Sequence, residues 1–65
     1  MNVPERINEI TELLKFRLYH VADKKVDELY EDWTSGKIKL TEKQEWLMFN
    51  FIDRISNALY CGMEF

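Results

Sequence analysis

Proline, glycine and cysteine are all scarce in this chain of 65 residues. One proline, Pro4, and two glycines, Gly36 and Gly62, leave long stretches without a residue that interrupts a helix. The single cysteine, Cys61, has no second thiol in the chain, and His20 is the only histidine. The sequence therefore favours long helices, excludes an internal disulfide or zinc framework, and indicates a reducing compartment. A Cys61–Cys61 bond between two chains is the alternative.

Long hydrophobic runs and an excess of basic residues are also missing. The most apolar segment, residues 46–51, is far shorter than the roughly 20 residues that span a bilayer, and no charged leader precedes an apolar run near the start. The net charge is −3, which disfavours nucleic acid as the main partner because phosphate binding needs clustered Lys and Arg. We expect a soluble, cytoplasmic protein without membrane association.

The apolar residues of the first half recur every three or four positions, which is typical of one face of a helix. They are Val3, Ile7, Ile10, Leu14, Leu18, Val21, Ala22, Val26, Leu29 and Trp33. Asn2 can cap this helix, Pro4 fits its first turn, and Glu5 suits the positive end of its dipole. The stripe is weakest at Lys25, where either the helix bends or two helices meet. Because no residue near position 23 interrupts a backbone, we expect one helix over about residues 4–34.

The second half predicts a helix over about residues 42–61. Thr41 and Gln44 have the spacing of a capping box before it. Gly36 can adopt the left-handed turn that ends the first helix, and Gly62 would end the second. One broad sector of the second helix is apolar and would face the first: Leu47, Met48, Phe51, Ile52, Ile55, Ala58 and Leu59.

These elements predict an all-α, antiparallel helical hairpin that forms a single domain over residues 1–65. The first helix is the longer, so about 10–15 Å of its start would overhang. Ile7, Ile10 and Leu13 would then have no cover within the chain. A chain of this size buries only about 60% of its surface on folding. We therefore expect two hairpins to complete a four-helix bundle as a homodimer.

Six of the nine aromatic residues lie off these apolar stripes. They are Trp46, Phe49 and Tyr60 in the second helix and Phe16, Tyr19 and Tyr30 in the first. Aromatic residues are enriched at the centres of interfaces; the alternative is that they are isolated exposed rings or tyrosines at the core edge. We predict a partner-binding surface made of Trp46, Phe49, Tyr60, Asp53, Phe16, Tyr19, Ile7, Ile10 and Leu13.

Two polar clusters suggest chemistry. His20, Asp23 and Asp27 share a helix face and could in principle bind a divalent metal, but solvated charge is the interpretation we favour. An acidic zone surrounds the turn between the helices and is either a solvated rim, a surface that steers a basic partner, or an imitation of nucleic acid; it comprises Glu28, Glu31, Asp32, Glu42 and Glu45. No phosphate loop, zinc spacing or nucleophile motif occurs. We expect no enzyme activity, cofactor, metal or small-molecule substrate.

The segment LTEKQ at residues 40–44, which precedes an apolar helix, resembles a segment of some helix-turn-helix transcription factors over about five residues. The resemblance implies a small DNA-binding regulator in which Lys43 and Gln44 would read bases. The same residues also form a generic capping box. The function we favour is a small regulatory or inhibitory protein, of the kind that bacteria or phages encode, which binds itself and a larger protein target. A purely structural self-assembling protein is the third hypothesis.

Overall fold

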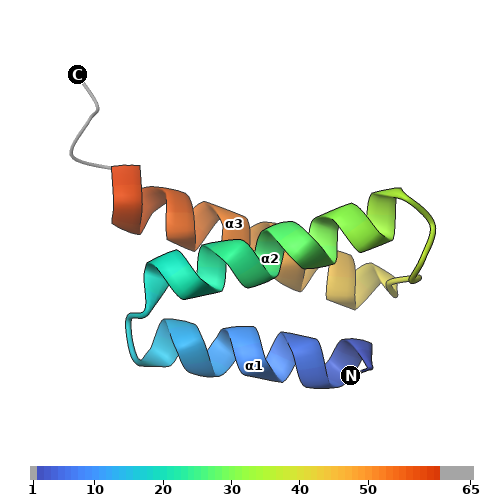
Figure 1. Cartoon of the computed structure of the whole chain (residues 1–65), viewed down its shortest axis with the longest axis horizontal. Coiled ribbons are helices and arrows are strands. Elements are labelled where there is room, and N and C mark those ends of the chain that lie inside the picture. The colour runs from blue at the N-terminus through green and yellow to red at the C-terminus, as the bar shows by residue number, and fades with distance from the viewer. Residues whose placement is uncertain (1, 61–65) are drawn as a thin grey trace.

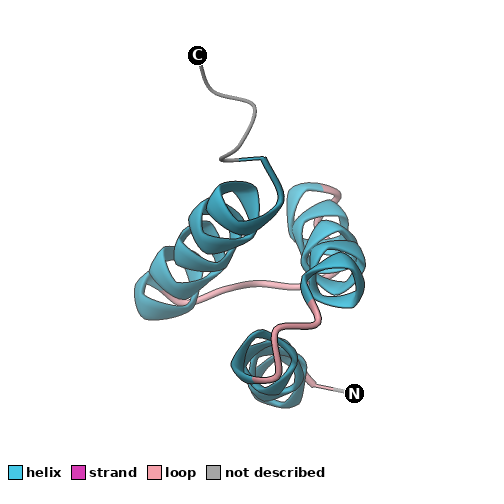
Figure 2. Cartoon of the chain, turned by 90° about the vertical axis from the view of Figure 1, so that its left-hand side faces the viewer, coloured by secondary structure: helices cyan, strands magenta, loops and turns pink. Residues whose placement is uncertain are grey.

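The computed structural model describes residues 2–60, and in this range the chain forms three α-helices and no strand. The helices are α1 (Val3–Lys15), α2 (Tyr19–Thr34) and α3 (Glu42–Tyr60). Each helix runs antiparallel to the one before it (Figure 1). Viewed along their axes, the three helices lie at the corners of a triangle, with α1 on one side of the α2/α3 pair (Figure 2). The all-α class is confirmed, whereas the two-helix architecture is wrong.

Two of the helices begin with the caps that the sequence predicts. At α1, the Asn2 side chain accepts a hydrogen bond from the Glu5 backbone N–H at 2.9 Å, and Glu5 accepts one from the Asn2 N–H at 3.1 Å. At α3, Gln44 donates its N–H to the Thr41 hydroxyl oxygen at 3.1 Å, and its own side-chain oxygen accepts from the Thr41 N–H at 2.9 Å. Each pair satisfies two backbone donors that a helix start leaves free.

The predicted continuous helix over residues 4–34 is interrupted at residues 16–18, earlier than the weak point at Lys25. Arg17 has a φ of 60°, which is the left-handed conformation that usually ends a helix at glycine. The Leu18 N–H donates to the Leu13 carbonyl at 2.9 Å, and the Arg17 N–H donates to the Leu14 carbonyl at 3.0 Å. These two bonds are those of a Schellman motif, which satisfies carbonyls at the end of α1 and turns the chain back as α2.

The end of α2 has the same hydrogen-bond pattern, this time with glycine. Gly36 has a φ of 88°, as the sequence predicts. The Lys37 N–H donates to the Asp32 carbonyl at 2.9 Å, and the Gly36 N–H donates to the Trp33 carbonyl at 3.2 Å. The connector that follows brings half-buried Ile38 and Leu40 against the core before α3 begins. The predicted end of α3 at Cys61 and its stop at Gly62 lie outside the described residues.

One core joins the three helices, and each helix contributes three buried residues to it: Ile7, Ile10 and Leu14 from α1, Ala22, Val26 and Leu29 from α2, and Met48, Phe51 and Ile55 from α3. The expectation that the start of the first helix overhangs is therefore wrong. Because the chain reverses at Arg17, α1 packs beside α2 and its apolar face becomes part of the core. Ile10, only 1% exposed, is among the most deeply buried side chains.

Candidate partner-binding surface

Four aromatic residues from α2 and α3 form a continuous cluster at the surface, which we call the aromatic face: Tyr30, Trp33, Trp46 and Phe49. The ring of Trp33 meets Phe49 edge to face with centroids 6.0 Å apart, and it meets Tyr30 in the same manner at 5.9 Å. Trp46 precedes Phe49 by one helical turn, so their side chains are neighbours on α3. Trp46 is 65% exposed and Phe49 is 49% exposed. The cluster therefore presents large apolar rings to solvent.

The aromatic face lies on the side of α2 that is turned away from α1. Lys25 and Asp32 mark the α1 side of α2, because each forms an ion pair with an α1 residue. Tyr30 lies roughly 150° around the helix from these two residues at 100° per residue. Figure 2 shows that α1 covers only one side of the α2/α3 pair. No described element covers the aromatic face.

Carboxylates border the aromatic face, and we call four of them the acidic rim: Asp27, Glu42, Glu45 and Asp53. Each lies three or four residues from Tyr30, Trp46 or Phe49 on the same helix, which is the spacing of side-chain neighbours. Lys43 is the one basic residue on α2 or α3 at that spacing. None of the four carboxylates forms an ion pair with another residue in the range 2–60. On α2 and α3, the charged neighbours of the rings are therefore predominantly negative.

The structure brings together part of the predicted partner-binding surface. Trp46 and Phe49 lie side by side in the aromatic face, and Asp53 is exposed one turn beyond Phe49. Tyr60 is also exposed on the same side of α3, but it lies about 16 Å further along the helix axis than Phe49. These four residues can contact one extended partner.

Phe16 and Tyr19 lie elsewhere in the fold. Phe16 is the C-cap residue of α1 and is 67% exposed, close in sequence to exposed Leu18 and Val21 at the α1–α2 corner. Tyr19 begins α2 and is half-buried against the core. Tyr30 and Trp33 of the aromatic face lie about 16 and 21 Å beyond Tyr19 along the axis of α2. Phe16 and Tyr19 do not extend the surface around Trp46.

The predicted partner-binding surface also includes Ile7, Ile10 and Leu13, because an overhanging helix would leave them uncovered. That reason does not hold. Ile7 and Ile10 are buried and Leu13 is half-buried against the core, since the turn at Arg17 places α1 beside α2. Their apolar surface is used within the chain.

Sequence reasoning missed Trp33 and left Tyr30 out of the surface. Trp33 follows the apolar stripe of α2, so its position predicts a core residue. It lies in the last turn of α2, however, and its ring is half-buried and reaches Phe49 on α3. The signal that identifies Tyr30 was present, because it lies off the stripe and three residues before Trp33 on the same helix surface.

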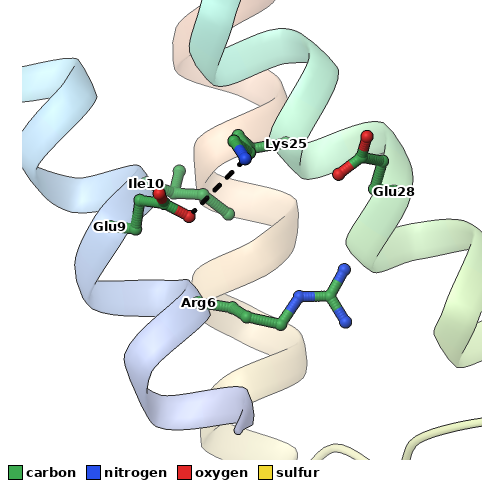
Figure 3. Close-up of a pocket in the computed structure, with 5 residues that line it drawn as sticks. All are labelled: Arg6, Glu9, Ile10, Lys25 and Glu28. Carbon is green, nitrogen blue, oxygen red and sulfur yellow. Dashed lines mark ion pairs between the residues drawn. The ribbon is translucent and has the colours of Figure 1, made fainter. Parts of the chain in front are cut away.

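A second surface feature is a hollow of about 250 Å³ between α1 and α2, lined by Arg6, Glu9, Ile10, Lys25 and Glu28 (Figure 3). Three of its four charged groups form ion pairs across the two helices. Arg6 donates to the Asp32 carboxylate at 2.9 Å, and the Lys25 ammonium lies 4.0 Å from the Glu9 carboxylate. The pairing explains why Lys25 can interrupt the apolar stripe of α2. The hollow thus consists mainly of contacts that hold α1 against α2.

Other predicted chemistry finds little geometric support within residues 2–60. No group of three or more His, Cys, Asp or Glu side chains in this range could hold a metal ion, and none of its helices is long and apolar enough to cross a membrane. Gln44, the candidate base-reading residue, folds its side chain back onto the Thr41 N–H. The connector between α2 and α3 covers residues 35–41, which is longer than the turn of about three or four residues in a helix-turn-helix motif.

Comparison with known proteins gives no relative from which a role could be transferred. No protein-family model matches the chain, and no curated protein or solved structure shows significant similarity to it.

Proposed function

We propose that this protein is a small, non-enzymatic regulator or inhibitor that acts by binding a larger protein through its aromatic face. The observation that supports this proposal best is the exposure of Trp46 at 65%, beside Phe49 at 49%, in a cluster that continues across two helices. Isolated exposed apolar residues are normal on a protein surface, but contiguous patches mark interaction sites. Trp and Tyr are also enriched among the residues that dominate binding energies.

A non-enzymatic role fits the character of the interior. Catalytic acids and bases are commonly held in desolvated sites, where burial tunes their pKa values. Among residues 2–60 every buried side chain is apolar. In the charged hollow between α1 and α2, Lys25 pairs with Glu9, and Arg6 pairs with the neighbouring Asp32. These features favour a binding protein over an enzyme.

Self-association remains the second candidate, either beside a larger target or as the whole role of the protein. The start of α1 is covered within the chain and gives no reason for a dimer, so the aromatic face is the apolar surface that supports one. A homodimer that uses this face would bury Trp46 and Phe49 against a second copy. Sedimentation across a dilution series distinguishes the cases, because a dimer that captures no other protein favours the structural role.

Truncation of the two most exposed rings of the aromatic face tests the proposal. After affinity capture and mass spectrometry identify the native partner, we expect Trp46→Ala or Phe49→Ala to weaken its binding by about 2 kcal/mol or more, which is roughly 30-fold. Helix content measured by circular dichroism should stay high because Trp46 is mostly exposed, Phe49 is about half exposed, and neither belongs to the buried core.

Phe16→Ala is the matched control, since it removes an equally exposed ring at the far end of α2. It should leave the affinity for the partner within about twofold of the wild type. If the double variant of Trp46 and Phe49 binds the partner as tightly as the wild type, the proposal is wrong.

DNA binding is the alternative that the LTEKQ segment raises. The exposed Lys43 and the acidic residues around it form no basic surface of the kind that neutralises phosphates. A direct test is retention on duplex DNA at low salt. Retention that declines steeply as salt is added would support the DNA-binding role, and its absence at low salt would dismiss that role.

A further inference from the structure

We propose that the occupant of the aromatic face is a basic, amphipathic helix of the partner protein, which lies along α2 and α3 on the side opposite α1. The inference deepens the proposed function and rests on it. It is carried by the size of the aromatic face, the charge of the acidic rim and the length of the surface along α3.

The exposed area of the rings is too small to form a stable interface alone. Aromatic side chains offer about 150–250 Å² each when fully exposed, so the exposed fractions of Tyr30, Trp46 and Phe49 amount to roughly 300 Å². A standard interface buries about 800 Å² on each partner. A partner must therefore also cover the residues that border the rings, and these form the acidic rim.

The negative charge of the acidic rim favours a partner with basic residues. Glu42 and Glu45 stand in the first turn of α3, where the helix dipole also favours them. Asp27 and Asp53 stand in mid-helix, where no such reason applies. Neither forms an ion pair with a described residue. Lys or Arg at the edges of an apolar helix face would pair with these carboxylates, whereas an acidic partner would be repelled.

The same charge argues against a second copy on this face. In a symmetric dimer the same patch meets itself, so Asp27 and Asp53 of one chain would approach those of the other. Lys43, the one basic neighbour of the rings on α2 or α3, would face four carboxylates on each side. Like charges brought together in an interface cost several kcal/mol, so self-association here is opposed.

The dimensions of the surface fit a helix of about four turns. The side of α3 that bears Trp46, Phe49, Asp53 and Tyr60 extends over about 21 Å, which 14 helical residues span. A helix laid there would occupy the open side of the α2/α3 pair as α1 occupies the other (Figure 2). Anchors on a docked helix are spaced three or four residues apart, as Trp46 and Phe49 are on α3, and Tyr60 lies eleven residues beyond Phe49.

The test uses two synthetic helical peptides of about 14 residues that share a leucine face and differ only at its edges. One peptide carries lysines there and the other glutamates. The full chain reports binding by its own fluorescence, because both of its tryptophans belong to the aromatic face. We expect the lysine peptide to shift the emission to shorter wavelength and to bind at least tenfold more tightly than the glutamate peptide.

Two charge-reversal variants of the protein distinguish an effect of the acidic rim on peptide binding from an effect of the net charge. Asp53→Lys and Glu12→Lys change the net charge equally, and both residues are exposed, but Glu12 lies on α1. Asp53→Lys should weaken binding of the lysine peptide at least fivefold, and Glu12→Lys should weaken it less than twofold. Equal weakening by the two variants, equal binding of the two peptides, or no binding of either peptide would overturn the inference.

The outcomes keep this inference separate from the proposed function. If Phe49→Ala weakens binding of the native partner while the two peptides bind equally tightly, the proposed function stands and the inference of a basic helix is wrong. If Phe49→Ala leaves the native partner unaffected, the proposed function itself fails. A wild-type dimer that Phe49→Ala dissociates would show that a second copy covers the face, and that result also overturns the inference.

Discussion

At the scale of single residues, the left-handed conformation of Arg17 has the largest effect on the shape of the molecule. An L-residue with a side chain pays about 1–2 kcal/mol in that conformation, and glycine avoids this cost. The chain uses glycine at the equivalent position after α2, where Gly36 ends the helix by the same hydrogen bonds. The α1–α2 corner therefore contains local strain that the packing of α1 against the core offsets.

Arg17→Gly should stabilise the protein by about 0.5–1 kcal/mol. Glycine removes the left-handed strain, and its greater freedom in the unfolded chain offsets part of the gain. Urea unfolding monitored by circular dichroism measures the difference. Lys15→Gly is the control. Lys15 is the last helical residue of α1, and glycine there should lower the stability by up to about 1 kcal/mol. Equal destabilisation by both substitutions would contradict the strain at Arg17.

Only some of these single-residue features can be predicted from the sequence. Caps depend on side chains that bond to the nearby backbone, so Asn2, Thr41 and Gly36 could be assigned from local pattern alone. The turn at Arg17 could not, because arginine has no preference for the left-handed region. Apolar residues at positions 14, 18 and 21 continue the helical spacing through the corner, which conceals the reversal of the chain.

At the scale of elements, each helix is fixed by its ends and by one apolar face. The ion pair between Arg6 at the start of α1 and Asp32 near the end of α2 joins the two helices in antiparallel alignment. Its side chains are partly exposed, so the pair adds only modest stability. Burial of Ile7, Ile10 and Leu14 contributes far more to holding α1 in place.

Ile10→Val tests whether α1 belongs to the core. Removal of one methylene from a side chain that is 1% exposed should cost about 0.5–1.5 kcal/mol. The measurement is the midpoint of thermal or urea unfolding at a concentration where the protein is monomeric. Val21→Ala, at a half-exposed position on α2, should cost less. A negligible effect of Ile10→Val in the monomer would indicate the overhanging helix instead of the three-helix fold.

The capping box of α3 provides a second test at this scale. Thr41→Ala removes the hydroxyl that accepts from the Gln44 N–H and should destabilise the protein by about 1 kcal/mol. Thr11→Ala removes a threonine from the interior of α1, where alanine is the better helix former. It should therefore leave stability unchanged or slightly higher. Similar losses for both variants would show that the cap does not stabilise α3.

At the scale of the whole molecule, the turn at Arg17 determines which apolar surface is left over. A straight first helix would expose the residues at its start. The folded-back α1 buries them and leaves the aromatic face as the principal exposed cluster of rings on α2 and α3. Helical periodicity alone predicts that Trp46 and Phe49 point away from the core. It could not predict that Trp33 joins them, because that contact depends on how α2 and α3 align.

The central claim is that the aromatic face is open to solvent in the lone molecule and becomes covered when a partner binds. Acrylamide quenching of Trp46 fluorescence tests it most directly, in a Trp33→Phe variant that leaves one tryptophan, at a dilution where sedimentation shows a monomer. We predict that Trp46 is readily quenched in the monomer and protected in the complex. A monomer in which Trp46 already resists quenching would contradict the account.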